Sequence, residues 1–157
     1  MHAIQYLKGD ATSPQAAGKK IIVHICNDVG GWGKGFVLAI SKRWPEPEAA
    51  YRKWYAERRD NDFGLGAVQF VPVDQYTWIA NLIGQHNMVG GAKGPPIRYE
   101  AVETGLATVA TKAQELTASV HMPRIGCGLA GGKWEKIEPV IERTLGRAGV
   151  KVYVYDF

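Results

Sequence analysis

The sequence has few cysteines, and none of them is paired at metal-binding or redox spacing. Cys26 and Cys127 are the two cysteines in 157 residues, and neither has a partner at C-x-x-C spacing, which argues against a zinc ribbon or a thioredoxin-type centre. A chain of this length buries a continuous core without disulfides or a structural metal. We therefore expect a single domain over residues 1–157, with no metal and no cofactor.

Long apolar runs and a strong charge imbalance are also missing. No stretch approaches the roughly 20 apolar residues of a membrane-spanning helix, and the first ten residues lack the pattern of a secretory signal. The formal net charge is only +4 and the basic residues are scattered, which is typical of solvated helix faces; attraction for nucleic acid is the alternative. We expect a cytoplasmic monomer with no membrane partner.

What is present is an alternation of short apolar runs with longer segments of helical periodicity. This alternation is typical of strands joined by crossover helices and predicts the α/β class. The expected strands are Ala3–Leu7, Ile21–Cys26, Ala67–Val73, Trp78–Ile83, Ser119–Met122 and Val150–Tyr155. The expected helices are Gly35–Arg43, Glu46–Arg58, Tyr99–Leu116 and Trp134–Arg147. The aperiodic segment His86–Pro96 is either a surface loop near a ligand or a passive connector.

Two glycine clusters each follow an expected strand and precede an expected helix. They read C-N-D-V-G-G-W-G-K-G-F (residues 26–36) and P-R-I-G-C-G-L-A-G-G-K-W (residues 123–134). In a parallel α/β sheet, ligands bind beyond the carboxyl ends of strands, where loop N–H groups converge. Glycine lets such a loop approach phosphate oxygens as an anion nest. The two loops therefore predict a diphosphate site, and tight turns without a ligand are the alternative.

Two well-known phosphate-binding motifs do not match these loops. A Walker loop requires G-x-x-x-x-G-K-[ST], but Lys34 is followed by Gly35 and Phe36, so no hydroxyl is available for magnesium. A dinucleotide fingerprint requires G-x-G-x-x-G after the first strand and an acidic residue ending the next strand. The cluster G-G-W-G-K-G-F and the strand Ala67–Val73 provide neither.

Three motifs in order resemble the macrodomain superfamily. They are Y-L-K-G-D-A-T (residues 6–12), V-H-I-C-N-D-V-G-G-W-G-K-G-F (23–36) and M-P-R-I-G-C-G-L-A-G-G-K-W (122–134), with the aromatic strand V-Y-V-Y-D-F (152–157). The closer resemblance is to the branch of ADP-ribose 1''-phosphate phosphatases and terminal ADP-ribose protein glycohydrolases. It implies a three-layer α/β/α sandwich with a mixed, mostly parallel sheet, and a cleft over the strand ends that binds ADP-ribose or ADP-ribose 1''-phosphate.

The resemblance also implies which residues bind the ligand. Asp10, flanked by Gly9 and Ala11, would accept a hydrogen bond from the adenine amine, whereas a turn or helix-capping aspartate is the alternative. Tyr155 or Phe157 would lie against the adenine, while Tyr153 is expected to pack in the core. Trp32 and Trp134 are either rim or core residues. The further ligand-binding residues are Asn27, Gly31, Trp32, Gly33, Lys34, Gly35, Phe36, Gln85, Ile125, Gly126, Cys127, Gly128, Leu129, Ala130, Gly131 and Phe157.

The catalytic residues of the glycohydrolases in this branch are absent. Those glycohydrolases resemble one another in having a lysine just past a central strand and the aspartate of G-C-G-L-D. This chain has Gln85 at the lysine position, which cannot form a Schiff base, and Ala130 at the aspartate position, which cannot act as an acid. A lysine-dependent route would need Lys93 from the neighbouring loop. The chain more closely resembles the phosphatases, which carry H-x-C-N and G-x-W-G on this strand and loop.

This resemblance gives a hypothesis for catalysis. Asn27 would position the distal ribose, and His24 or Asp28 would transfer a proton while water attacks the terminal phosphate or C1''. The alternatives are a core role for His24 and a loop-capping role for Asp28. Cys127, in a loop before a helix N-terminus, is either a nucleophile or a packing residue, and packing is the expected role. The cluster 85–87 either orients water or satisfies loop backbone.

The resemblance leaves three functions open. The first is a hydrolase that removes a 1''-phosphate or an ADP-ribosyl group. The second is a non-catalytic ADP-ribose reader. The third is a module that acts on ADP-ribosylated nucleic acid. The expected partners are ADP-ribose or ADP-ribose 1''-phosphate, and an ADP-ribosylated protein or nucleic acid is a further expected partner.

Overall fold

One mixed sheet forms the centre of the molecule. The computed structural model describes residues 4–87, 95–128 and 130–157. The strand order is β1-β6-β5-β2-β4-β3, and every neighbouring pair is parallel except β3 and β4, which are antiparallel. The strands are β1 (Ile4–Lys8), β2 (Lys20–Asn27), β3 (Val68–Asp74), β4 (Thr77–Gln85), β5 (Ser119–Met122) and β6 (Val152–Asp156). The predicted mixed, mostly parallel sheet is confirmed.

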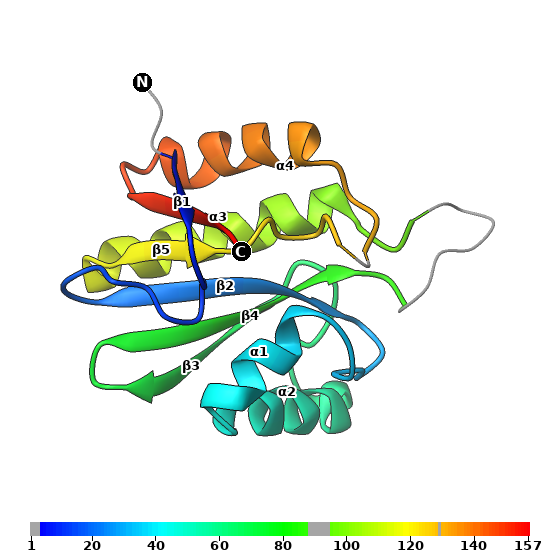
Figure 1. Ribbon diagram of the computed structural model, residues 1–157. Coiled ribbons are helices and arrows are strands. Elements are labelled where there is room, and N and C mark those ends of the chain that lie inside the picture. The colour runs from blue at the N-terminus through cyan, green and yellow to red at the C-terminus, as the bar shows by residue number, and fades with distance from the viewer. Residues whose placement is uncertain (1–3, 88–94, 129) are drawn as a thin grey trace.

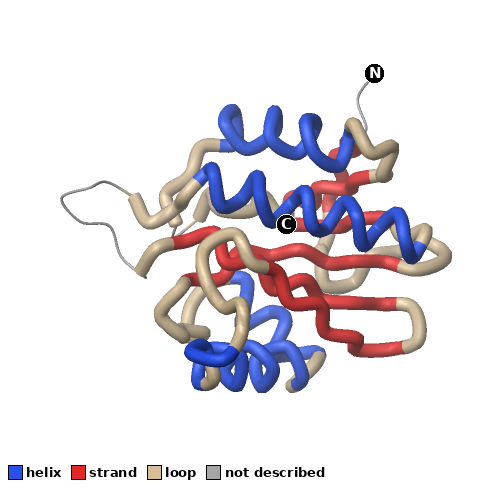
Figure 2. The backbone as a smooth tube through the Cα atoms, turned by 180° about the vertical axis from the view of Figure 1, so that it is seen from behind, coloured by secondary structure: helices blue, strands red, loops and turns tan. Residues whose placement is uncertain are grey.

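Helices cover both faces of this sheet. Figure 1 shows α1 and α2 on one side and α3 and α4 on the other, and Figure 2 shows the same two layers from behind. The expected three-layer sandwich is therefore confirmed. The helices are α1 (Phe36–Arg43), α2 (Glu46–Ala56), α3 (Tyr99–Leu116) and α4 (Trp134–Ile141), with a 3₁₀ turn at Arg58–Asp60 and π-helical turns at Glu142–Gly146.

The alternation of side chains along the central strands builds two separate cores. In β2, Ile21 and Val23 pack in the same core as Val102 and Leu106 of α3. The intervening Ile22 packs on the opposite face, in the core of α1 and α2. Successive side chains of a strand point to opposite faces, so a strand buried on both faces reads as the continuous apolar run seen in the sequence.

The predicted boundaries differ from the structure mainly around the last helix. The α-helix ends at Ile141 instead of Arg147 and continues as π-helical turns. Pro139 lies inside α4 and has no N–H to donate to the preceding turn. The following strand begins at Val152 and not at Val150, because the Val150 N–H donates to the carbonyl of Leu145 (3.0 Å) and closes the helix. Ala3, the expected start of the first strand, lies outside the described residues.

The direction of the strands brings the predicted loops together. All strands except β3 run parallel, so their carboxyl ends lie at the same end of the sheet. The loop before α1 and the loop before α4 both leave from that end (Figure 1). Among the described residues, no helix has the length and apolar character to cross a bilayer.

Candidate functional site

Two joined cavities lie between the glycine loops. The larger has a volume of about 330 Å³ and the smaller about 70 Å³, and both are lined by Lys34 and Gln85. We call them together the cleft. Predicted residues that line the larger cavity are His24, Lys34, Gly35, Phe36, Gln85, Ile125, Gly126, Gly128 and Ala130. Those that line the smaller one are Asn27, Gly31, Trp32, Gly33, Lys34 and Gln85.

A third cavity, of about 610 Å³, opens beyond the ends of β1 and β6. Gly9 and Asp10 line it, as do Tyr153 and Tyr155 of β6. The Gly9 N–H donates to the carbonyl of Asp156 (2.9 Å), which holds the end of β1 beside β6. The residues predicted to bind the adenine thus line one cavity, and the residues predicted to bind the diphosphate line another.

Asn27 braces the first loop from within. Its Oδ1 accepts hydrogen bonds from the N–H groups of Val29 and Gly31 (both 3.0 Å), and its Nδ2 donates to the carbonyl of Gly31 (2.9 Å). The Tyr51 hydroxyl donates to the Asn27 carbonyl (2.6 Å) and also lies 3.0 Å from Oδ1. With these groups engaged, Asn27 shapes the loop and is not free to position a ribose. The ribose-positioning role expected for it is not supported.

The backbone N–H groups that follow in the first loop are unpaired within the described chain, unlike those that Asn27 holds. The N–H groups of residues 32–36 make no hydrogen bond to any described residue. Gly35 adopts a φ of 84°, in the left-handed region, and starts α1 without a side-chain cap. Consecutive unpaired N–H groups next to a helix N-terminus attract an anion. The first loop therefore offers donors to the cleft where the sequence predicts phosphate binding.

The second loop is held in a tight turn that only glycine fits. Gly126 has a φ of 73°, and a Cβ there would lie 2.7 Å from the Ile97 side chain. The Gly132 N–H donates to the Gly126 carbonyl (2.7 Å), which closes the loop on itself. The N–H groups of Gly126, Gly128 and Ala130 make no hydrogen bond to a described residue. This loop also presents backbone donors on its side of the cleft.

The charged side chains that line the cleft are both cations. Lys34 comes from the first loop and Arg124 from the second, and no carboxylate lines either cavity. Within the described residues, no group of three or more His, Cys, Asp or Glu side chains is arranged to hold a metal ion. Two cations and unpaired N–H groups together suit a diphosphate.

Arg124 is fixed from outside the cleft. Its guanidinium makes a bidentate ion pair with Asp156 (2.7 and 3.0 Å) and lies over the rings of Tyr6 (5.2 Å) and Trp134 (5.1 Å). The hydrogen bond from Arg124 lowers the pKa of Asp156. The Trp134 indole N–H donates to the Tyr6 hydroxyl (3.0 Å), and that hydroxyl contacts Glu138. Sequence reasoning missed Arg124, although the arginine of M-P-R-I-G was a signal.

His24 lies in the core beneath the first loop. The ring is 1% exposed, its Nε2 lies 2.5 Å from Asn81 Oδ1, and Trp32 packs edge-on against it. Burial lowers the pKa of His24 to about 4, and the hydrogen bond to Asn81 opposes this shift only in part. A neutral, hydrogen-bonded ring in this position is poorly suited to proton transfer at neutral pH. The core role is the reading that the geometry supports.

Asp10 lines the largest of the three cavities, and its carboxylate already has partners. Its Oδ1 accepts hydrogen bonds from the Thr12 N–H (2.8 Å) and hydroxyl (2.7 Å), and Oδ2 lies 3.8 Å from the Arg43 guanidinium. Burial opposes ionisation, yet the Thr12 hydrogen bonds and the Arg43 charge together lower the pKa of Asp10. Asp10 remains an ionised acceptor at the edge of the largest cavity.

The aromatic residues of the last strand are distributed differently from the prediction. Phe157 is fully exposed and lines none of the three cavities, so its placement against an adenine stays a prediction that the cavities do not support. Tyr153, expected in the core, lines the largest cavity and stacks on His121 with a 4.9 Å centroid distance. Tyr155 lines the same cavity and bonds to the His121 ring (2.8 Å). Burial lowers the pKa of His121 to about 4.

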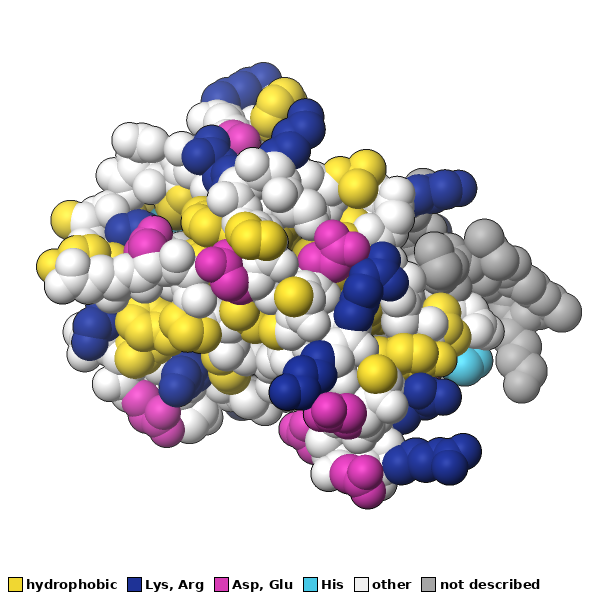
Figure 3. Space-filling view, turned by 90° about the horizontal axis from the view of Figure 1, so that it is seen from below, with side chains coloured by type: hydrophobic (Ala, Val, Ile, Leu, Met, Phe, Trp, Pro, Cys, Tyr) yellow, Lys and Arg dark blue, Asp and Glu magenta, His cyan; other side chains and the backbone are white. Residues whose placement is uncertain are grey.

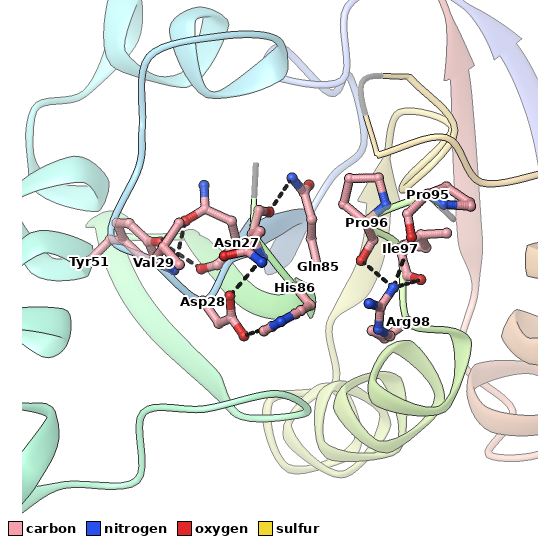
Figure 4. A network of polar contacts seen from close by, with 11 residues as sticks. Asn27, Asp28, Val29, Tyr51, Gln85, His86, Pro95, Pro96, Ile97 and Arg98 are labelled. Carbon is pink, nitrogen blue, oxygen red and sulfur yellow. Dashed lines mark hydrogen bonds and ion pairs between the residues drawn. The ribbon is translucent and has the colours of Figure 1, made fainter. Parts of the chain in front are cut away.

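A few predicted residues lie beside the cavities and not on their walls. Ala11 is buried, and the side chain of Asp28 points away from the cleft toward His86 (Figure 4). Cys127 and Gly131 belong to the second loop but line no cavity, and burial raises the pKa of the Cys127 thiol, as expected for a packing residue. Leu129 and Lys93, together with residues 88–94 of the segment His86–Pro96, lie outside the described residues.

The comparisons with known proteins agree with the fold. No model of a protein family matches the chain. A solved macrodomain protein from Streptomyces coelicolor is 60% identical, with a TM-score of 0.89, 98% of this chain and 99% of that chain covered. Another solved structure, a protein of unknown function from Bacteroides thetaiotaomicron, is 57% identical with a TM-score of 0.94 and covers 98% of both chains.

Three curated proteins are also similar. The chromodomain-helicase-DNA-binding protein 1-like of Mus musculus is 33% identical over 99% of this chain, which spans 18% of that protein's length. A DNA ADP-ribosyl glycohydrolase of Thermus aquaticus is 30% identical over 86% of this chain and 37% of its own length. An ADP-ribose 1''-phosphate phosphatase of Lodderomyces elongisporus is 25% identical over 98% of this chain and 99% of its own. With the macrodomain similarity over nearly the full length, the chain belongs to the macrodomain family.

Proposed function

We propose that this protein binds ADP-ribose along the cleft and hydrolyses a bond at its 1'' position. The run of unpaired N–H groups at residues 32–36 carries the proposal. These donors lie in a wall that also contains Lys34 and Arg124 and no carboxylate. Such a wall suits the two phosphates of a nucleoside diphosphate. The names of two relatives give further support: the Lodderomyces elongisporus protein is an ADP-ribose 1''-phosphate phosphatase and the Thermus aquaticus protein a DNA ADP-ribosyl glycohydrolase.

The three cavities suggest how the ligand would lie. The diphosphate would occupy the 330 Å³ cavity between the two loops. The adenine would reach the 610 Å³ cavity beside Asp10, where Tyr155 offers an aromatic surface. The distal ribose would point into the small cavity lined by Gly31 and Gly33. The leaving group would be a phosphate, or the protein or nucleic acid that carries the ADP-ribose.

A non-catalytic reader is the second candidate, and two residues favour it. Gln85 and Ala130 line the cleft where the resemblance places the lysine and aspartate of glycohydrolases. Neither side chain can form a covalent intermediate or carry a proton at neutral pH. A hydrolase of this construction would therefore depend on a positioned water and on electrostatic stabilisation by the loops.

Two measurements test the proposal. Calorimetry with ADP-ribose should give binding in the micromolar range, and no binding at millimolar ligand would overturn both candidates. Incubation with ADP-ribose 1''-phosphate should release phosphate, and incubation with ADP-ribosylated protein or DNA would reveal release of free ADP-ribose. Binding without release from any of these substrates identifies a reader.

A further inference from the structure

The ends of β2 and β4 are joined by a cluster centred on the backbone of Asn87. Its N–H donates to Asp28 Oδ1 (2.9 Å), and its carbonyl accepts from Gln85 Nε2 (2.8 Å). Asn87 adopts a φ of 63°, a left-handed conformation that asparagine tolerates better than most residues. The Asn87 peptide groups therefore couple the two side chains.

The carbonyl of Asn87 fixes which way round the Gln85 amide lies. A carbonyl oxygen has no hydrogen to donate, so the amide nitrogen must face it, and the network assigns the orientation. Oε1 is then turned away from Asn87 and receives no hydrogen bond from a described residue. Because Gln85 lines both cavities of the cleft, it presents an unpaired acceptor to them.

Asp28 holds this arrangement from the side away from the cleft. Its carboxylate is mostly buried and bonds to His86 Nδ1 (2.7 Å) as well as to Asn87. Its own N–H donates to the Gln85 carbonyl (3.0 Å), and the His86 N–H donates to the Pro96 carbonyl (2.8 Å). Neither Asp28 nor His86 lines the cleft. The geometry thus replaces the expected proton-transfer role of Asp28 with a positioning role.

We infer that Gln85 orients the attacking water in the hydrolysis proposed above, and that Asp28 positions Gln85 through Asn87. The inference rests on that proposed function. Gln85 Oε1 accepts one hydrogen of the water, so that a lone pair of the water oxygen faces the phosphorus of a 1''-phosphate. The oxygen bonds to phosphorus, the bond from phosphorus to the 1'' oxygen breaks, and the proton of the water passes to that oxygen. The products are ADP-ribose and inorganic phosphate.

A neutral amide suits this role in a cleft that binds a diphosphate. A carboxylate at position 85 would repel the phosphates, whereas an amide oxygen accepts the water's hydrogen bond without adding charge. Orientation of a water by one hydrogen bond contributes through alignment and not through proton transfer. The role therefore predicts a loss in kcat with little change in ligand affinity.

The test is Gln85→Met, which keeps the length of the side chain and removes its oxygen. With ADP-ribose 1''-phosphate we expect kcat to fall about 100-fold, the size typical of a lost positioning contact, while KM and the Kd for ADP-ribose stay within about threefold. Gln75→Met places the same substitution in the turn before β4, and should leave all three values unchanged. An unchanged kcat in Gln85→Met, with active wild type, would overturn the inference alone.

The role of Asp28 is tested by a double-mutant cycle. Asp28→Ala should lower kcat about tenfold with KM unchanged, and Asp28→Asn should keep most of the activity because its Oδ1 still accepts from Asn87. In the Gln85→Met background, Asp28→Ala should cause no further loss. Additive losses would overturn the coupling. If the wild type binds ADP-ribose but releases neither phosphate nor ADP-ribose from any substrate, the proposed hydrolase fails, and this inference with it.

Discussion

The two glycine loops of the cleft have similar sequences of small residues but are held in opposite ways. The first loop is braced from within: the buried side chain of Asn27 accepts hydrogen bonds from the N–H groups of Val29 and Gly31, and the Tyr51 hydroxyl donates to the Asn27 carbonyl. The second is braced from outside, by the half-exposed pair of Arg124 and Asp156 and by the rings under Arg124. Buried polar contacts are costly to break, whereas exposed ion pairs contribute little. The first loop is therefore the rigid wall and the second the adjustable one.

The largest expected effect comes from removal of the internal brace. Asn27→Ala leaves the N–H groups of Val29 and Gly31 without their acceptor, although the Tyr51 hydroxyl keeps the backbone carbonyl of residue 27. It should lower the free energy of unfolding by about 3 kcal/mol. ADP-ribose affinity should fall about 100-fold in calorimetry, because the donors at residues 32–36 lose their alignment. Tyr51→Phe is the milder control and should cost about 1 kcal/mol. A stable Asn27→Ala protein with wild-type affinity would contradict an internal brace.

The second effect is a dependence of stability on pH, which the two buried histidines beneath the site should cause. His24 and His121 both have a pKa of about 4 in the folded state, against an ordinary histidine value of 6.5. The unfolded state therefore binds more protons between these values, and stability falls as pH falls from 6.5 toward 4. From pH 7.5 to pH 5 each histidine should cost about 2 kcal/mol. Urea unfolding at several pH values measures the slope, and His121→Phe should reduce it by about half; an unchanged slope would show that His121 does not contribute.

A third experiment fills the open space beside each loop. A Cβ on Gly33 or on Gly128 would meet no atom within 4 Å, and neither residue has a positive φ. Gly33→Ala and Gly128→Ala should therefore leave the melting temperature unchanged. Each should nevertheless reduce ADP-ribose affinity about tenfold, because the methyl group occupies space next to the phosphates. Gly64→Ala, equally unobstructed but distant from the cleft, is the matched control; equal affinity in all three variants would place the ligand elsewhere.

The smallest effect should come from the external brace. Arg124→Gln removes the bidentate pair and one cation of the wall, and should weaken ADP-ribose binding about threefold, with a smaller salt dependence than the wild type. Asn27→Ala should leave the salt dependence as it is. Calorimetry at 50 and 300 mM salt compares the two variants. A larger loss for Arg124→Gln than for Asn27→Ala would reverse the assignment of the rigid and adjustable walls.

Local sequence patterns predicted the elements of the fold well. The apolar stripe of Tyr99–Leu116 and the run Ser119–Met122 coincide with α3 and β5, because a helical period and a buried strand are properties of neighbouring residues. The two glycine loops were predicted for the same reason. The last helix was wrong at its end, where Pro139 and the Val150 hydrogen bond decide the geometry.

Contacts between distant residues were not predictable in the same way. Arg124 meets Asp156, and Asp28 meets His86, only because β5 and β6, and β2 and β4, end at one edge of the sheet. The burial of His24 against Asn81 likewise depends on the pairing of two strands. Phe157 follows a buried strand yet is exposed. Roles for single side chains therefore needed the structure.

The outer faces of the molecule fit the scattered charge of the sequence. Seen from the side of α2, Lys and Arg side chains are interspersed with Asp and Glu (Figure 3). The exposed pair Arg52–Glu48 of α2 is an example of this mixing, and the pair Arg143–Glu103 shows it on the opposite layer. A mixed surface gives no directional attraction for a polyanion, so recognition of a nucleic acid would depend on the cleft and its rim.

The pairing of β1 with β6 has a consequence for the order in which the protein assembles. These strands pair from Ile4 with Val152 to Lys8 with Asp156, so β1 has no neighbour in the sheet until β6, more than 140 residues later in the sequence, has been made. Contacts between chain ends so far apart form late, because the intervening chain must first be closed. The parts of the cleft built on β2 and β4 come together earlier. We expect the cavity beside Asp10 to be the last part of the site to form.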